Sequence, residues 1–249
     1  MESALAIRGL AKRFGETTAL AGLDLEVAPG EVFGLVGPDG AGKTTAMRLA
    51  AGLLAPDAGT IEALGAEIPR RIAEVRPRIG YMPQQYSLYG DLSVAENLRF
   101  FAGMYGVPRK AFRERSARLL DMARLSEFCE RPAAALSGGM YKKLALACAL
   151  VHAPELLLLD EPTNGVDPVS RRELWAFLRE QVGAGVAVLY STPYMEEAAR
   201  CDRVGLVVDG RIRATGRPAD LIAAHGEAAA SFEDVFLALT SSGAPEAAP

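Results

Sequence analysis

The stretch EVFGLVGPDGAGKTTAMRLA (residues 31–50) decides the fold. Residues 31–37 form a short apolar run that predicts a buried strand, and residues 43–54 have the apolar spacing of a helix. The glycine-rich loop between them matches G-x-x-x-x-G-K-[ST], whose backbone N–H groups converge on phosphate oxygens at a helix N-terminus. We therefore expect nucleotide phosphates here, with Lys43 reaching the β- and γ-phosphates and the Thr44 hydroxyl helping to hold Mg²⁺.

A second motif, LLLLDEP (residues 156–162), is an apolar run that ends in two acids. Asp160 is placed to bind Mg²⁺ through water, and Glu161 is placed to orient or deprotonate an attacking water. Taken alone, the acids could simply begin a helix. Beside a phosphate-binding loop they favour hydrolysis of a nucleoside triphosphate.

The composition is that of a globular protein, with 249 residues of which 50% are hydrophobic and 23% charged. A net charge of −4, with scattered basic residues, gives no reason to expect a nucleic-acid partner. The widely spaced cysteines (Cys129, Cys148 and Cys201) predict free thiols in a reducing compartment. Because the sequence has neither a signal peptide nor ~18 consecutive apolar residues, we expect a soluble chain that reaches any membrane through a partner.

The order of elements predicts an α/β fold, since strand patterns alternate with helix patterns at both ends of the chain. Strands are expected at 4–14, 18–27, 31–37, 59–65, 155–160, 186–191 and 203–210. Helices are expected at 43–54, 93–106, 110–125 and 138–151, from about 168, and from Tyr194. The fold class is thus a P-loop core with a mainly parallel sheet, an antiparallel β subdomain at the N-terminal side, and an all-helical insertion.

A third motif, LSGGM (136–140), lies about twenty residues before the acidic pair. Together with GPDGAGKTT, YMPQ, LLLLDEP and NGVD, in this order, it makes the chain resemble the nucleotide-binding subunits of ABC transporters, from about residue 4 to residue 240. The resemblance implies an ATPase domain at 1–240. Its core would occupy about 1–90 and 153–225, its helical subdomain about 91–152, and a disordered tail or linker 241–249.

In that family two such domains dimerise head to tail, and each ATP lies between one phosphate-binding loop and the other domain's LSGG segment. The resemblance implies nucleotide contacts from Phe14, Gly37, Pro38, Asp39, Gly40, Ala41, Gly42, Lys43, Thr44, Thr45, Ser137, Gly138, Gly139 and Asp167. It implies catalytic roles for Glu161, Gln84 and Lys43, and Mg²⁺ ligation by Thr44, Gln84 and Asp160. Ser137 would also cap the helix whose positive end faces the partner's γ-phosphate.

Some of these assignments have alternatives. Phe14, which the resemblance stacks on adenine, could instead be a core residue of a strand. Gln84, which would couple Mg²⁺ to a membrane partner, has Gln85 beside it as a substitute, or could be an ordinary loop residue.

Within the family, the chain looks most like the ATPases of ABC-2-type exporters, which serve separate membrane proteins, often in efflux of drugs or other hydrophobic compounds. It also resembles the first half of tandem exporter ATPases. The implied partners are integral membrane permease subunits and a second ATPase domain, in a homodimer or in a heterodimer or tandem. The implied location is the cytoplasmic face of the cell membrane, as a peripheral protein.

Two positions depart from the family pattern. Asp39 replaces the usual asparagine and either weakens nucleotide binding slightly or only shapes the loop. Pro193, in LYSTPYMEEAAR (189–200), replaces a histidine that donates to the γ-phosphate, and His152 and His225 lie elsewhere. Thr192 is a plausible N-cap and proline suits a first helical position, so the change is structurally acceptable but removes a donor.

We therefore expect the site built on this chain's own phosphate-binding loop to bind ATP and Mg²⁺ but to turn over slowly, unless Thr192 or Tyr194 replaces the histidine. An alternative is a regulatory module that dimerises on ATP with little hydrolysis. A ribosome- or DNA-associated ABC protein is disfavoured by the lack of a basic surface or a long charged linker.

Overall fold

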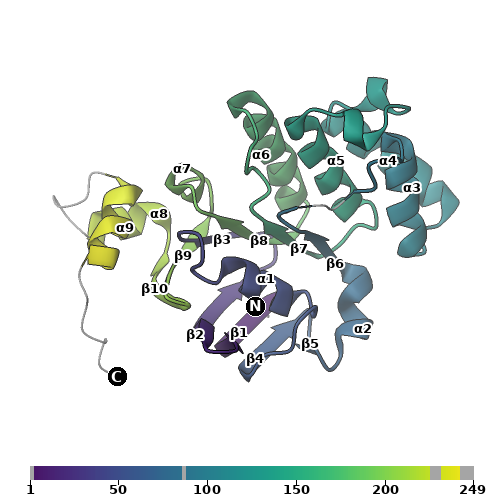
Figure 1. The fold of residues 1–249 in the computed structure, drawn as a ribbon. Helices are drawn as coiled ribbons and strands as arrows, with labels where there is room; N and C mark the ends of the chain where they lie inside the picture. Colours follow the sequence, from purple (N-terminus) through teal and green to yellow (C-terminus); the bar gives the residue numbers. More distant parts are fainter. Residues whose placement is uncertain (1–2, 86–87, 225–230, 242–249) are drawn as a thin grey trace.

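Two β-sheets organise the molecule (Figure 1). The computed structural model describes residues 3–85, 88–224 and 231–241. The first sheet is antiparallel, with the strand order β2-β1-β4-β5. Its strands are β1 (Leu5–Phe14), β2 (Thr17–Val27), β4 (Ala58–Ala63) and β5 (Ala66–Ile68).

The second sheet has the order β10-β9-β3-β8-β7-β6 and is parallel except for β10, which pairs antiparallel with β9. Its strands are β3 (Val32–Val36), β6 (Ile79–Met82), β7 (Leu156–Asp160), β8 (Ala187–Thr192), β9 (Arg203–Val208) and β10 (Arg211–Gly216). The expected fold class is thus confirmed. Because β3, β8 and β7 are parallel neighbours, the loops that follow them meet at one edge of the sheet.

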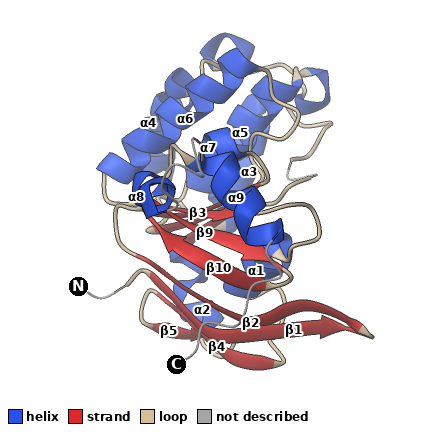
Figure 2. Cartoon of the chain, turned by 90° about the vertical axis from the view of Figure 1, so that its left-hand side faces the viewer, coloured by secondary structure: helices blue, strands red, loops and turns tan. Residues whose placement is uncertain are grey.

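The central strands are buried throughout because the parallel sheet is covered on both faces. On one face, α1 (Lys43–Ala50) lies between the two sheets, where Met47 and Leu49 join a core with Leu5 and Ile61 of the antiparallel sheet (Figures 1 and 2). On the other face, helices form a second core over the sheet. Both faces of strands such as LLLLD are therefore apolar, as their sequence indicates.

The helical insertion lies beside the parallel sheet and consists of α3 (Val94–Met104), α4 (Arg109–Met122) and α5 (Gly138–Leu150), with the short helices η2 (Ser126–Phe128) and η3 (Ala133–Ala135). A capping box starts α3: the Ser93 hydroxyl accepts from Glu96 N, and the Glu96 carboxylate accepts from Ser93 N. Within the described residues, no strand lies between β6 and β7. The remaining helices are α2 (Ile72–Val75), η1 (Arg76–Arg78), α6 (Pro168–Gly183), α7 (Met195–Ala198), α8 (Pro218–Ala224) and α9 (Phe232–Ser241).

The structure corrects one local prediction about the end of β8. Thr192 is not a helix N-cap, because α7 begins at Met195 and its N-cap is Tyr194, with no side-chain capping bond. The Thr192 hydroxyl instead donates to Glu197 at 2.6 Å, so Pro193 lies in the link between strand and helix and not at a first helical position.

Three further observations bear on the sequence predictions. All three cysteines are free. Ser241 still belongs to α9, and the rest of the expected tail, 242–249, lies outside the described residues. Among the described parts of the chain, no helix is both long and apolar enough to cross a membrane.

Candidate active site

The loop that connects β3 to α1 depends on glycines at two positions where it touches other backbone. A Cβ on Gly37 would lie 2.4 Å from Val207 O, and a Cβ on Gly42 would lie 2.4 Å from Ala19 O. Gly42 also has φ 103°, a left-handed conformation that only glycine adopts readily, and it directly precedes α1. The loop is therefore held close against β2 and β9, with the N-terminus of α1 at its end.

Lys43 folds back over this loop. Its Nζ donates to Gly37 O at 2.9 Å and to Pro38 O at 3.0 Å. The same Nζ lies 3.3 Å from Glu161 Oε1, and both side chains are almost completely buried. The ammonium group that is expected to hold phosphates is thus satisfied by loop carbonyls and by the expected catalytic carboxylate.

Asp160, at the end of β7, has one carboxylate oxygen that accepts hydrogen bonds and one that has no hydrogen-bond partner. Its Oδ1 accepts from the Ser191 hydroxyl at 2.7 Å and from the Thr44 hydroxyl at 3.1 Å. Its Oδ2 is buried without a hydrogen-bond partner, and burial raises the pKa of this carboxyl. A free carboxylate oxygen beside a threonine hydroxyl fits Mg²⁺, which binds through few protein oxygens and keeps water or phosphate in its other positions.

Glu161 is held from several sides. Its Oε2 accepts from Gln84 Nε2 at 2.7 Å and from Asn164 Nδ2 at 3.3 Å. Its backbone has φ 47°, an uncommon conformation for a non-glycine residue, and its N–H donates to the Ser191 hydroxyl at 3.0 Å. Gln84, 77 residues away in the sequence, is thereby brought into direct contact with Glu161.

A cleft of about 350 Å³ lies over the phosphate-binding loop. Its walls combine the loop with the acidic strand end and with the start of β2, and are formed by Thr17, Thr18, Ala19, Asp39, Gly40, Gly42, Lys43, Thr44, Thr45, Gln84 and Glu161. Thr17, Thr18 and Ala19 could not be predicted as cleft residues, because no local pattern in the sequence marks a hairpin residue as part of a cleft. Phe14 is not in this lining, but it is 49% exposed and pairs across the hairpin with Thr17.

The two positions that depart from the family pattern are Asp39, within this loop, and Pro193. Asp39 is exposed and lines the cleft. The carbonyl of Thr192 accepts from Gly37 N at 3.3 Å, so position 193 directly follows a residue bonded to the first residue of the loop. Position 193 is thus one residue from a backbone contact with the phosphate-binding loop, although Pro193 does not line the cleft, and proline has no donor.

The LSGG segment lies outside the cleft. Ser137 is the N-cap of α5, and its hydroxyl accepts from Met140 N at 3.3 Å. Asp167 caps α6 by accepting from Val169 N and Ser170 N, and these bonds, first of all the one from Ser170, lower the pKa of Asp167. None of Ser137, Gly138, Gly139 and Asp167 lines the cleft, so this chain does not bring them to its own phosphate-binding loop.

The helical insertion is tied to the cleft through α5. Lys142 Nζ donates to Gln84 O at 2.7 Å, and burial lowers the pKa of Lys142. The Tyr141 hydroxyl accepts from Leu88 N at 3.2 Å. The segment that carries Gln84 is thus bonded on one side to α5 and on the other to Glu161.

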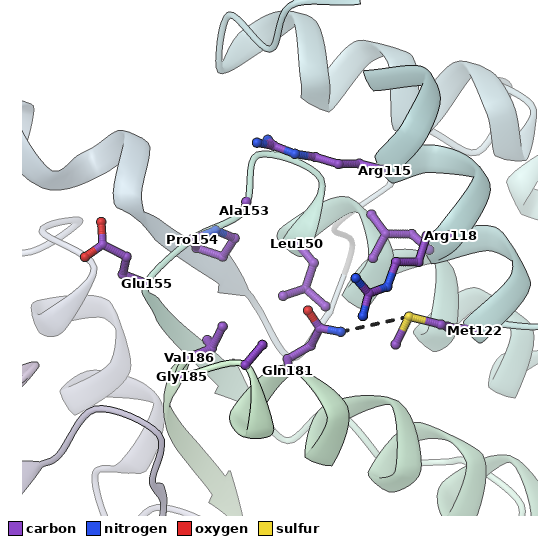
Figure 3. Close-up of a pocket in the computed structure, with 12 residues that line it drawn as sticks. Arg115, Arg118, Met122, Leu150, Ala153, Pro154, Glu155, Gln181, Gly185 and Val186 are labelled. Carbon is purple, nitrogen blue, oxygen red and sulfur yellow. Dashed lines mark hydrogen bonds between the residues drawn. The ribbon is translucent and has the colours of Figure 1, made fainter. Parts of the chain in front are cut away.

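A second cleft, of about 400 Å³, lies at the opposite end of the strands (Figure 3). It is formed where α5 and α6 end and where β7 and β8 begin, with Arg115 and Arg118 from α4 above it. Arg118 pairs with Glu180 at 2.6 Å, and Glu155 pairs with Arg78. The phosphate-binding loop and the two acids are far along the strands from this cleft, so we assign the chemistry to the smaller cleft.

Comparisons with known proteins agree with this geometry. The sequence profile of the family described as "ABC transporter" matches residues 20–164. The chain is 42% identical over 220 residues to the "Probable multidrug ABC transporter ATP-binding protein YbhF" of Escherichia coli (strain K12), an alignment that covers 88% of this chain but only 38% of that protein. It is 43% identical over 219 residues to the "Nod factor export ATP-binding protein I" of Ralstonia nicotianae, covering 88% of this chain and 68% of the relative.

Solved structures show the same likeness. The chain superimposes on "Structure of ATP binding subunit of ABC transporter" with a TM-score of 0.87 and 30% identity, over 96% of this chain and 100% of that one. It superimposes on the structure of cbiO1 from Clostridium perfringens, described as part of the ABC transporter complex cbiONQ, with a TM-score of 0.80 and 29% identity, over 90% of this chain and 92% of that one.

Proposed function

The chain belongs to the ABC transporter family of ATP-binding proteins, and from that premise we propose that it binds and hydrolyses ATP to power an exporter in the membrane. The observation that carries the proposal is the meeting of Lys43, Asp160 and Glu161 at one edge of the parallel sheet. The names of the relatives support export, since one is described as a multidrug transporter protein and the other as a Nod factor export protein. Which compound this chain helps to export depends on its membrane partner.

In the proposed reaction, water attacks the γ-phosphorus of ATP while the bond to the β-phosphate oxygen breaks. Lys43 leaves its loop carbonyls to bind the β- and γ-phosphates, and the N–H groups of the loop bind phosphate oxygens. Thr44, Asp160 and Gln84 would hold Mg²⁺, which would supply neutralisation of the phosphate charge when bound. Glu161 accepts the proton of the attacking water, and ADP and phosphate are released.

The site is proposed to be completed by a second ATPase domain. Ser137, Gly138, Gly139 and Asp167 lie outside the cleft of their own chain. In a head-to-tail dimer they would face the nucleotide of the partner, with the N–H groups at the start of α5 directed at its γ-phosphate. Phe14, exposed on β1, is proposed to stack on adenine.

The membrane partner is proposed to contact the exposed apolar side chains Tyr89, Phe100 and Met104, which are 51%, 41% and 58% exposed. The rings of Tyr89 and Phe100 are in edge contact, with centroids 4.6 Å apart. These three side chains come after Gln84 in the sequence, and Gln84 contacts Glu161. A permease helix bound to them would therefore be linked through Gln84 to the proposed catalytic carboxylate. This contact would hold the chain at the cytoplasmic face of the membrane as a peripheral subunit.

Turnover at this chain's own phosphate-binding loop is proposed to be slow because Pro193 lacks the donor that histidine supplies. Loss of a transition-state donor slows catalysis on the order of 10²–10³-fold. The experiment is a comparison of steady-state ATPase activity and Mg-ATP binding for the purified chain. ATP binding with slow turnover supports the proposal, and absence of Mg-ATP binding contradicts it.

A purely regulatory role is the second candidate, and it is favoured by the same proline. Such a module would dimerise on ATP with little hydrolysis. The two are separated by single-turnover hydrolysis within the ATP-bound dimer: slow but complete conversion to ADP identifies the ATPase, and persistence of ATP identifies the regulatory module.

A further inference from the structure

We propose that Tyr194 and Asn164 are positioning residues for Glu161, and that the buried carboxylate of Glu197 holds the frame in which they act. The inference rests on the proposed ATPase function. It concerns Tyr194, which directly follows the histidine-less position, and Asn164, which lies in the loop after Glu161. It identifies which side chain of this segment supports hydrolysis in the absence of a histidine.

Two hydrogen bonds connect Tyr194 to Glu161. The Tyr194 hydroxyl donates to Asn164 Oδ1 at 3.4 Å, and Asn164 Nδ2 donates to Glu161 Oε2 at 3.3 Å. Both distances are long for hydrogen bonds, as is common at catalytic sites before the substrate binds. The connection orients one oxygen of Glu161, and because the Asn164 amide carries no charge, the carboxylate stays negatively charged.

The frame around this connection is built on Glu197, which is 1% exposed. Its Oε1 accepts from the Thr163 hydroxyl at 2.5 Å, and its Oε2 accepts from the Thr192 hydroxyl at 2.6 Å and the Tyr190 hydroxyl at 3.0 Å. Thr163 directly precedes Asn164, and Thr192 precedes Pro193. One buried carboxylate thus fixes the loop that carries Asn164 relative to the segment that carries Tyr194.

Arg171 of α6 supports the same frame. Its Nε lies 3.6 Å from Glu197 Oε1, which balances the buried charge. Its guanidinium lies over the Tyr194 ring, 5.1 Å from the centroid. This contact limits the orientations that the ring can adopt. The tyrosine is therefore held at its ring by Arg171 and at its hydroxyl by Asn164.

These contacts distinguish Thr192 from Tyr194 as the side chain that supports Glu161, whereas the donor to the γ-phosphate that Pro193 lacks is supplied by neither. The Thr192 hydroxyl is buried, donates to Glu197 and accepts from Tyr194 N at 3.0 Å, so it is committed to the frame. Pro193 has no donor. Tyr194 is only partly buried, and its hydroxyl is directed to the loop that follows Glu161.

The test uses the full chain and measures kcat and KM for Mg-ATP separately. Tyr194→Phe removes only the hydroxyl, and we expect kcat to fall about 3- to 10-fold with KM unchanged, the effect of one lost hydrogen bond. Asn164→Ala is expected to lower kcat at least as much. Because Tyr194 acts through Asn164, the double variant should be no slower than Asn164→Ala alone.

Tyr105→Phe is the matched control, since the Tyr105 ring stacks on His152 far from the cleft and the change removes the same hydroxyl. Thermal unfolding of each variant separates loss of catalysis from loss of folding, and the exposed Asn164 provides a second test should Tyr194→Phe unfold. A Tyr194→Phe kcat equal to that of the unmodified chain, or losses that multiply in the double variant, overturns the inference.

The outcomes also separate this inference from the proposed function. If the unmodified chain hydrolyses ATP and Tyr194→Phe does so at the same rate, the inference is wrong while the proposed ATPase function stands; if the unmodified chain retains bound ATP over hours, hydrolysis itself is contradicted. If the unmodified chain does not bind Mg-ATP at all, the proposed function itself is contradicted.

Discussion

Lys43 Nζ lies 3.3 Å from Glu161 Oε1, so the residue that should bind phosphate is paired with the residue that should deprotonate water. Both are buried. Arrival of ATP must separate them, because the phosphates compete with Glu161 and with the loop carbonyls for the same ammonium group. We therefore predict that binding of ATP frees the carboxylate of Glu161 from Lys43.

Glu161→Gln should therefore bind ATP more tightly than the unmodified chain while hydrolysing it at least about 10²-fold more slowly. The amide keeps the shape and the contacts to Gln84 and Asn164 but no longer holds Lys43 by charge. Titration with a fluorescent ATP analogue gives the affinity, and phosphate release gives the rate. The control is Glu155→Gln, an exposed carboxylate at the other end of the strands. Weaker ATP binding by Glu161→Gln contradicts the competition.

The two glycines of the LSGG segment should differ in their tolerance of alanine. A Cβ on Gly139 would lie 2.4 Å from Ser170 Oγ and 2.6 Å from Ser170 Cβ, whereas a Cβ on Gly138 would meet only Gly165 O at 3.5 Å. Gly139→Ala should lower the free energy of unfolding by about 1–3 kcal/mol through overpacking, and Gly138→Ala by much less. Urea unfolding measures both, and equal stabilities would show that Gly139 of α5 does not approach Ser170 of α6 this closely.

Protonation of His152 should destabilise the fold as the pH falls. Burial lowers the pKa of His152 from 6.5 to about 4, while its Nε2 contacts Ile79 O at 3.1 Å and its ring stacks on Tyr105. The neutral ring is fully favoured above the unfolded pKa, and this stability is lost as the pH falls from 6.5 toward 4. Between about pH 7.5 and about pH 5 we expect a loss of about 1–2 kcal/mol from this residue.

His152→Gln provides the comparison, because the amide can still reach Ile79 O but does not titrate. Unfolding free energies of the variant should fall less over the same pH range than those of the unmodified chain. Parallel pH dependences in the two proteins would mean that His152 is protonated equally in both states.

Much of the site could be predicted because its motifs are local. The strand, glycine-rich loop and helix at 31–50 are contiguous, and the acids follow an apolar strand directly, so the sequence places Lys43, Asp160 and Glu161 just beyond the carboxyl ends of two buried strands. Ser137 likewise caps the helix that follows it. In each case the chemistry and the element that positions it are neighbours in the sequence.

What could not be predicted depends on contacts between distant segments. The sequence predicts Thr192 as an N-cap, but in the structure its hydroxyl donates to Glu197. The hydroxyls of Tyr190 and Thr163 donate to the same carboxylate, and only the fold shows this. β6 has only four residues, which is too short for a periodic pattern. Lys43 follows β3 and Glu161 follows β7 in the sequence. The two residues meet because both strands lie next to β8, and this strand order is a property of the fold.

The most direct test is the ATPase rate of the chain and of Pro193→His, measured at saturating Mg-ATP together with the amount of ATP bound. Position 193 follows Thr192, whose carbonyl accepts from Gly37 N, so the substitution is made one residue from the backbone of the phosphate-binding loop. We expect slow turnover by the unmodified chain and a faster rate, by about 10-fold or more, for the variant, with ATP binding little changed. Vigorous turnover by the unmodified chain, or an unchanged rate in the variant, would contradict the account.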